Sequence, residues 1–191
     1  KLEKEGKTET AKRVNIIISQ IARYAILHDL AEHDPTASYK IGDVITMKPT
    51  KHFAAITEPK QLAPLLRDVD NYWGKAETRA ALQLLPMFLL RPGNLRHLEW
   101  AKVDFDEKQI VFPLKDMKKK TRDHIVPLAT QAIEILKELQ PFTGHGKYLF
   151  PCIRSATRAI SENTLNAAFR RMGYGKEEVT THGFRATAKT I

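Results

Sequence analysis

The sequence contains very little cysteine and no long apolar run. Cys152 is the one cysteine among 191 residues, so a disulfide within the chain and a zinc site built from several thiolates are both excluded. This scarcity of cysteine suits a reducing cytoplasm. The longest apolar stretch, residues 82–90, is interrupted by Gln83 and Pro86 and is much shorter than the roughly 18 residues of a membrane-spanning helix. We therefore expect no membrane partner.

The beginning of the chain also shows no secretory signal, because its first ten residues, KLEKEGKTET, are polar. The first residue is Lys1 rather than Met, so we expect the chain to be a piece of a longer polypeptide. Hydrophobic residues make up 42% of the chain and charged residues 28%, which is typical of a globular protein. A length of 191 residues allows one full domain or one and a half.

Positive charge is concentrated in the last part of the sequence. The whole chain has 31 Lys and Arg against 22 Asp and Glu, a net charge of +9. Residues 114–191 hold 14 basic and 7 acidic side chains, which is +7 of that excess. A basic half indicates a polyanionic partner, and nucleic acid is the first candidate. The alternative is a basic protein without such a partner.

Hydrophobic spacing predicts a helical segment followed by a larger mixed region. Apolar residues recur every three or four positions over 8–33, which predicts one long helix that Pro35 ends. Residues 36–56 lack this period, so we interpret them as a linker. Further helices are predicted over residues 57–72, 77–90, 94–100, 130–139 and 162–172 and from 181 onward, and short strands over 101–105, 109–113 and 124–128. The predicted fold is mainly α with a small antiparallel β-sheet, an α+β arrangement.

Three groups of basic side chains are candidates for chemistry. Arg91 is followed by Pro92-Gly93, which breaks the preceding helix and lets the arginine point away from its axis. His182 and Arg185 are three residues apart, so on a helix they share one face and together suit a phosphate group. The third group occupies the polar tip between two predicted strands and consists of Lys115, Lys118, Lys119, Lys120 and Arg122. Taken singly, each group also fits a structural explanation: a surface arginine, a capping histidine and a solvated turn.

Taken in order along the chain, these groups resemble the lambda-type tyrosine recombinases, and specifically the P4-like integrases of prophages and genomic islands. The stretches that carry the resemblance are LLRPGNLRHLEWAKVDFD at residues 89–106, MKKKTRDHIVPL at 117–128 and THGFRATAKT at 181–190. ETAKRVNIIISQIARYA, at residues 9–25, is similar to the last long helix of that family's core-binding domain. KHFAAITEPKQLAPLL, at residues 51–66, is similar to the start of its catalytic domain.

The resemblance implies a division of the chain and roles for individual residues. Residues 1–48 would be the C-terminal part of the core-binding domain with the linker, and residues 49–191 a catalytic domain whose end is missing. Arg91 and Arg185 match the two catalytic arginines, and His182 matches the histidine of the HxxR box. Lys119 matches the catalytic lysine, with Lys118 as the alternative because the turn carries one extra residue relative to the usual pattern. Asn94 departs from the family, which usually has an acid there that helps to orient the arginine. The expected DNA-binding residues are Lys115, Lys118, Lys120, Arg122, Arg170 and Arg171.

The family's nucleophilic tyrosine lies well beyond the HxxR box. All five tyrosines of this chain precede the box, and none matches the nucleophile: Tyr24, Tyr39, Tyr72, Tyr148 and Tyr174. We therefore expect these 191 residues to bind duplex DNA without cleaving it.

The resemblance implies site-specific recombination of double-stranded DNA, for the integration or excision of a prophage or genomic island. The reaction would pass through a 3′-phosphotyrosine intermediate and need no metal, ATP or other cofactor. The full-length protein would act as a tetramer on its attachment site, in the bacterial cytoplasm at the nucleoid, whereas this chain would be a monomer or weak dimer. Two alternatives stay open: a type IB topoisomerase, which shares this chemistry, and a non-catalytic DNA-binding regulator that uses the lysine turn as a phosphate clamp.

Overall fold

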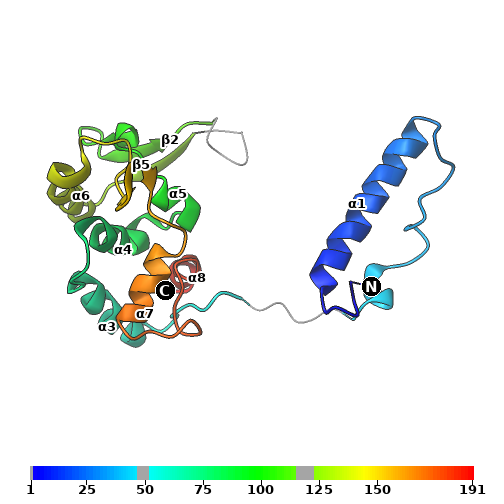
Figure 1. The fold of residues 1–191 in the computed structure, drawn as a ribbon, viewed down its shortest axis with the longest axis horizontal. Helices are drawn as coiled ribbons and strands as arrows, with labels where there is room; N and C mark the ends of the chain where they lie inside the picture. The colour runs from blue at the N-terminus through cyan, green and yellow to red at the C-terminus, as the bar shows by residue number, and fades with distance from the viewer. Residues whose placement is uncertain (1, 47–51, 115–122) are drawn as a thin grey trace. The chain divides into compact units, whose positions relative to one another are not determined.

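The computed structural model describes residues 2–46, 52–114 and 123–191 (Figure 1). The chain forms two compact units, Lys1–His52 and Phe53–Ile191. Within the described ranges, no helix is both long enough and apolar enough to cross a membrane.

The first unit is built on one long helix, α1 (Thr8–Leu27), which ends earlier than the predicted residue 33. Asp29 adopts a left-handed backbone conformation with a φ of 55°, and the amide of Leu30 donates to the carbonyl of Ala25 at 2.8 Å. This is a Schellman-type helix end, in which glycine is the usual left-handed residue. The end of this helix could not be predicted from the sequence, because Asp29 rather than glycine stands at the left-handed position.

A loop returns from this helix end and is tied to α1 through Asp34. The Asp34 carboxylate accepts hydrogen bonds from the Ser19 hydroxyl at 2.6 Å and from the Thr36 amide and hydroxyl at 2.8 Å each. These bonds favour the charged form and lower the pKa of Asp34. A single helical turn, α2 (Ile41–Val44), follows inside the segment that the sequence predicts as a linker.

The apolar face of α1 remains open to solvent. Ile17, Ile21 and Leu27 have exposed fractions of 52%, 63% and 78%. A helix stripe of this kind is normally covered by another element.

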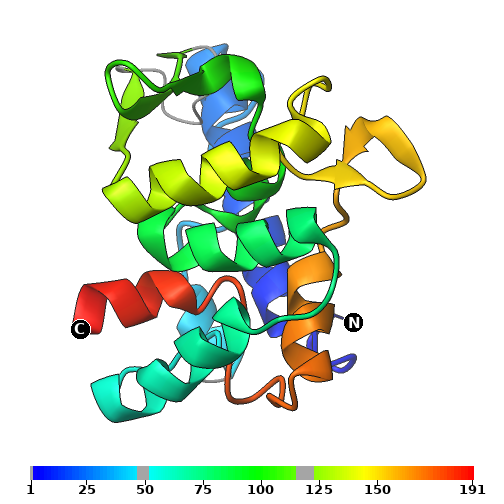
Figure 2. The same cartoon turned by 90° about the vertical axis from the view of Figure 1, so that its left-hand side faces the viewer.

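The second unit is organised around α4 (Ala76–Phe88), which has six buried side chains: Ala80, Ala81, Leu82, Leu84, Leu85 and Phe88. It contacts α3 (Pro59–Asp70), α5 (Pro92–Arg96), α6 (Thr130–Thr143), α7 (Thr164–Arg171) and α8 (Phe184–Thr190). Figure 2 shows α4 in the middle, with α6 on one side and α3 and α8 on the other. Neighbouring helices on several sides therefore cover the apolar side chains of α4.

A small antiparallel sheet covers another part of the core. Its order is β1 (Val103–Asp104), β2 (Gln109–Phe112) and β3 (His124–Pro127), and Phe112 pairs with His124. A 3-10 turn, η1 (Trp100–Lys102), precedes it, and β4 (Pro151–Cys152) and β5 (Ser155–Ala159) form a separate hairpin that the sequence did not predict. The prediction of helices around a small antiparallel sheet is confirmed.

Candidate active site

Arg91 lies where the central helix ends. Leu89 closes α4 with a left-handed φ of 50°, an uncommon conformation for a residue other than glycine. Arg91 is then the N-cap of α5, with Pro92 in the first turn, and its carbonyl accepts a hydrogen bond from the Leu95 amide at 3.0 Å. The backbone is therefore fixed on both sides of Arg91, while its side chain is exposed.

His182 lies in a tight turn before α8 rather than in a helix. The predicted helix starting at Thr181 begins only at Phe184, and residues 181–183 form a turn. The Thr181 amide and hydroxyl both donate to the Asn166 side-chain carbonyl on α7, each at 3.0 Å. The Thr180 hydroxyl accepts from the Gly183 amide at 3.0 Å and donates to the Ala54 carbonyl at 3.2 Å. These bonds hold the turn from two directions and leave the imidazole of His182 exposed.

Gly183 allows this turn to lie directly against the start of the second unit. A Cβ atom at Gly183 would stand 1.9 Å from the Ala54 carbonyl oxygen and 2.8 Å from its carbonyl carbon. Both atoms belong to the backbone, so neither can move aside cheaply. The glycine between His182 and Arg185 is thus required by a close approach of two chain segments.

Arg185 projects from the first turn of α8 toward the end of α4. Its guanidinium donates a hydrogen bond to the carbonyl of Leu89, two residues before Arg91. The neighbouring Phe184 is buried, and its ring stacks on Phe169 of α7 with centroids 5.8 Å apart. Packing of Phe184 therefore fixes α8. This position of α8 directs the side chain of Arg185 toward the carbonyl of Leu89.

The structure brings the predicted residues together around Arg91. One cavity of about 420 Å³, which we call the arginine cavity, is lined by Arg91, Arg185, Asn94 and strand β3. A second cavity of about 370 Å³, the histidine cavity, is lined by Arg91, Asn94, His182, Glu162 and Phe53. Arg91 and Asn94 line both, so the two cavities meet at the Arg-Pro-Gly turn. Guanidinium and imidazole donors that converge in this way suit a phosphate oxyanion.

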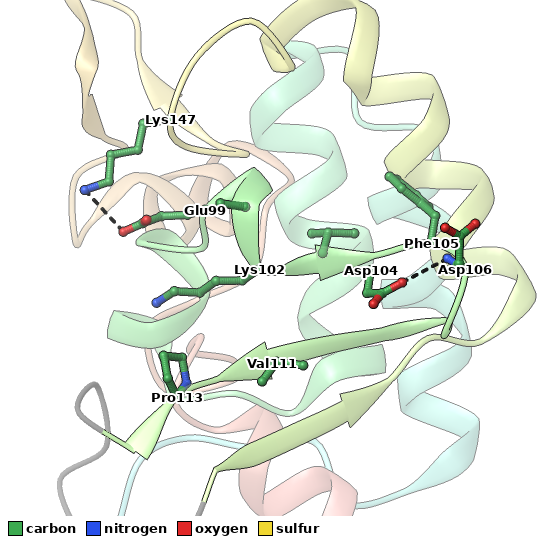
Figure 3. Close-up of a pocket in the computed structure, with 10 residues that line it drawn as sticks. Glu99, Lys102, Asp104, Phe105, Asp106, Val111, Pro113 and Lys147 are labelled. Atoms are coloured by element: carbon green, nitrogen blue, oxygen red, sulfur yellow. Dashed lines mark hydrogen bonds and ion pairs between the residues drawn. The ribbon is translucent and has the colours of Figure 1, made fainter.

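A larger cavity of about 820 Å³ lies on the sheet and has a different character (Figure 3). Three acidic residues, Glu99, Asp104 and Asp106, share its lining with two lysines. Lys147 forms an ion pair with Glu99 at 3.3 Å, and the Asp104 carboxylate accepts a hydrogen bond from the backbone amide of Asp106 at 3.0 Å. Acidic residues outnumber lysines in its lining, so it is a poor anion site compared with the arginine cavity.

The lysine turn falls outside the described residues, and with it Lys115, Lys118, Lys119, Lys120 and Arg122. Its two ends are described: the Leu114 amide donates to the Asp123 carboxylate at 2.7 Å, and β3 follows directly. Because β3 lines the arginine cavity, the turn is joined in sequence to the wall of that cavity.

Arg170 and Arg171 are the other predicted DNA-binding residues, and both donate hydrogen bonds to other residues of the chain. Arg170 donates to the Val179 carbonyl at 2.5 Å, and its Nε and Nη1 are buried with no hydrogen-bond partner among the described residues. Arg171 donates to the Tyr72 hydroxyl at 3.4 Å. Their contact with DNA stays a prediction.

No tyrosine lines either the arginine or the histidine cavity among the residues that the structure describes. Tyr174 is engaged elsewhere, because its hydroxyl donates to Asp68 at 2.5 Å. Burial, together with this bond and the negative charge of Asp68, raises the pKa of Tyr174 to about 12. A hydroxyl held in its neutral form is a weak nucleophile.

Several residues of the site could not be found from the sequence. Phe53, Glu162, Asn166 and Thr180 line the histidine cavity, and His124 lines the arginine cavity. They carry no motif, and all except Thr180, which lies two residues before His182, come from other segments of the sequence. Across the described ranges, no group of three or more His, Cys, Asp or Glu side chains is arranged to hold a metal ion.

Comparison with known proteins assigns the family. Residues 56–191 match the Phage integrase family, and residues 1–41 match the Phage integrase central domain. The chain belongs to the phage integrase family. The integrase of Enterobacteria phage P4 is 34% identical over 202 aligned positions, which cover 99% of this chain and 45% of that protein. The prophage integrase IntA of Escherichia coli K12 is 30% identical, covering 97% of this chain and 44% of that protein. The chain thus spans about half the length of these relatives.

Solved structures share the integrase fold at low sequence identity. A lambda integrase dimer bound to a COC′ core site has a TM-score of 0.68 and 16% identity, covering 98% of this chain and 53% of that one. The Tn1549 transposon integrase in complex with circular intermediate DNA has a TM-score of 0.71 and 16% identity, covering 98% of this chain and 67% of that one. The resemblance to tyrosine recombinases is confirmed at the level of family and fold.

The close approach at Gly183 predicts a large effect of a small substitution. Gly183→Ala should lower the free energy of unfolding by about 1–3 kcal/mol, because the new methyl group overlaps backbone atoms of Ala54. Gly93→Ala is the matched control, since a Cβ there meets nothing within 4 Å, and in helix α5 it should stabilise by about 0.5–1 kcal/mol. Urea unfolding measures both. Equal effects of the two substitutions would contradict the close packing at Gly183.

The hydrogen bond of Tyr174 predicts a pH dependence of stability. The pKa of Tyr174 is about 12 in the folded chain, above the usual value of 10.0, so folding favours the protonated hydroxyl. The resulting stabilisation is fully present below about pH 10 and is lost as the pH rises toward about 12. Tyr174→Phe should therefore unfold with a shallower decline of stability over this interval. Parallel declines for the two proteins, measured by urea unfolding, would argue against this assignment.

Proposed function

We propose that this chain is part of a site-specific DNA recombinase that integrates or excises a prophage or genomic island. The observation that carries the proposal is the convergence on Arg91: it shares one cavity with Arg185 and an adjoining cavity with His182. The family of the chain and the excess of basic residues in 114–191 support the same conclusion.

The proposed chemistry is transfer of a DNA phosphoryl group to tyrosine. A tyrosine oxygen attacks the backbone phosphorus, a 3′-phosphotyrosine bond forms, and the bond to the 5′ oxygen breaks. Arg91, Arg185 and His182 stabilise the negative charge that develops on the non-bridging oxygens. Lys119, or its neighbour Lys118, gives a proton to the departing 5′ oxygen. The phosphotyrosine conserves the energy of the broken bond, so rejoining needs no cofactor.

The proposed organisation follows the two parts of the sequence. Residues 1–48 are the C-terminal part of a helical core-binding domain with the linker, which the exposed apolar face of α1 and the match of residues 1–41 support. Residues 49–191 belong to the catalytic domain. The whole protein would act as a tetramer on duplex DNA in the bacterial cytoplasm, at the nucleoid, and the 191-residue chain would be a monomer or weak dimer.

DNA binding by the 191-residue chain should depend on salt and on the clustered arginines. The logarithm of its affinity for a duplex should fall linearly with the logarithm of the salt concentration, because bound phosphates release counterions. Arg91→Ala and Arg185→Ala should each weaken binding about tenfold and reduce the salt slope by about 1. Lys137→Ala, which removes one exposed charge from α6 outside both cavities, is the control. Fluorescence anisotropy at several salt concentrations measures these effects, and an affinity independent of salt would refute the proposal.

Cleavage is tested with a suicide substrate that traps the covalent intermediate. We expect no protein–DNA adduct from the 191-residue chain, because none of its five tyrosines lines either cavity and all five precede the HxxR box. A full-length version should form the adduct, and Arg91→Ala should abolish it even at protein concentrations that compensate for its roughly tenfold weaker DNA binding. An adduct formed by the 191-residue chain would overturn the assignment of the nucleophile.

The same assays separate the two other functions that share these residues. Relaxation of supercoiled plasmid without site preference by the full-length version would favour a type IB topoisomerase. Binding of full-length protein without any cleavage, with only some loss of affinity in Arg91→Ala, would favour a regulator.

A further inference from the structure

The ring of Phe53 lies against the imidazole of His182. The two ring centroids are 4.3 Å apart, and the planes are inclined by 40°. Phe53 is the first residue of the second unit, and both residues line the histidine cavity. Residues that are far apart in the sequence are therefore in direct contact where Arg91 also lies.

This contact is the main restraint on the His182 ring. Within the described part of the chain, the imidazole has no hydrogen-bond partner, and the ring of Phe53 is its one aromatic neighbour. A histidine that must present one nitrogen to a phosphate normally has its ring orientation set by a bond to the other nitrogen. Here a tilted aromatic contact occupies that role.

The backbone next to Phe53 is tied to the turn that carries His182. The Ala54 carbonyl accepts hydrogen bonds from the Thr180 amide and the Thr180 hydroxyl, both at 3.2 Å. Gly183 then lies so close to Ala54 that no side chain fits between them. The position of Phe53 relative to His182 is thus fixed by backbone contacts on both sides of the histidine.

Burial does not explain why Phe53 is placed there. Its exposed fraction is 61%, so most of its ring contributes nothing to the core. Phe142 on α6 is exposed to a similar extent, 65%, and lies outside both cavities. The pair offers a matched comparison between an exposed phenylalanine at the site and one elsewhere.

We propose that Phe53 is a positioning residue that holds the imidazole of His182 toward the phosphate site shared with Arg91. The start of the second unit is then part of the site rather than only a connection. This inference rests on the proposed function, since it assigns His182 a phosphate to bind.

The contact itself is tested without DNA. In the 191-residue chain, the ring proton signal of His182, assigned with His182→Gln, should carry a ring-current shift from Phe53. Phe53→Leu should abolish that shift, Phe53→Tyr should retain it, and Phe142→Leu should leave it unchanged. A His182 signal that does not respond to Phe53→Leu would overturn the proposal.

Duplex binding tests the consequence. Phe53→Leu should weaken binding about two- to tenfold, the range expected for loss of one aromatic contact. Phe53→Tyr and Phe142→Leu should bind like the unmodified chain, which separates positioning from a general loss of stability. If Arg91→Ala weakens binding and Phe53→Leu does not, the positioning role is wrong while the proposed function stands. If neither weakens binding, the proposed function fails, and the role of Phe53 fails with it.

Discussion

The close contact between Gly183 and Ala54 is the constraint on which the site depends. It places the turn that carries His182 against the first residues of the second unit, and the Thr180 hydroxyl bridges the two segments through Gly183 and Ala54. Asn166 holds the same turn from α7. Because a turn restrained from two sides keeps its shape without a helix, His182 can stand exposed and still be fixed relative to Arg91.

The central helix supplies the other half of the arrangement. The packing of α4 in the core fixes its end, and the left-handed Leu89 turns the chain so that Arg91 becomes the N-cap of α5. The carbonyl of Leu89 also accepts the hydrogen bond of Arg185, so one helix end orients both arginines. Stability of the core and geometry of the site are therefore properties of the same residues. Preorganised donors of this kind stabilise developing charge without further rearrangement.

The sequence predicted the parts of this structure that depend on local patterns. Apolar spacing located the long helices, and the Arg-Pro-Gly turn and the HxxR box located Arg91, His182 and Arg185. It could not predict contacts made by residues without a motif, such as Phe53 against His182. Some helix boundaries were also misplaced. The end of α1 was missed because Asp29 stands where glycine usually ends a helix. The last helix begins at Phe184 rather than Thr181, after a turn that Thr180 and Asn166 hold by hydrogen bonds between distant segments, which the sequence pattern does not show.

The central claim is that Arg91, His182 and Arg185 form a single site for one DNA phosphate. The most direct test is a crystal structure of this chain bound to a DNA duplex. We predict that the side chains of all three residues lie within hydrogen-bond distance of the same backbone phosphate, at the junction of the arginine and histidine cavities. A complex in which the three side chains contact different phosphates, or in which the duplex lies against another face, would contradict the claim.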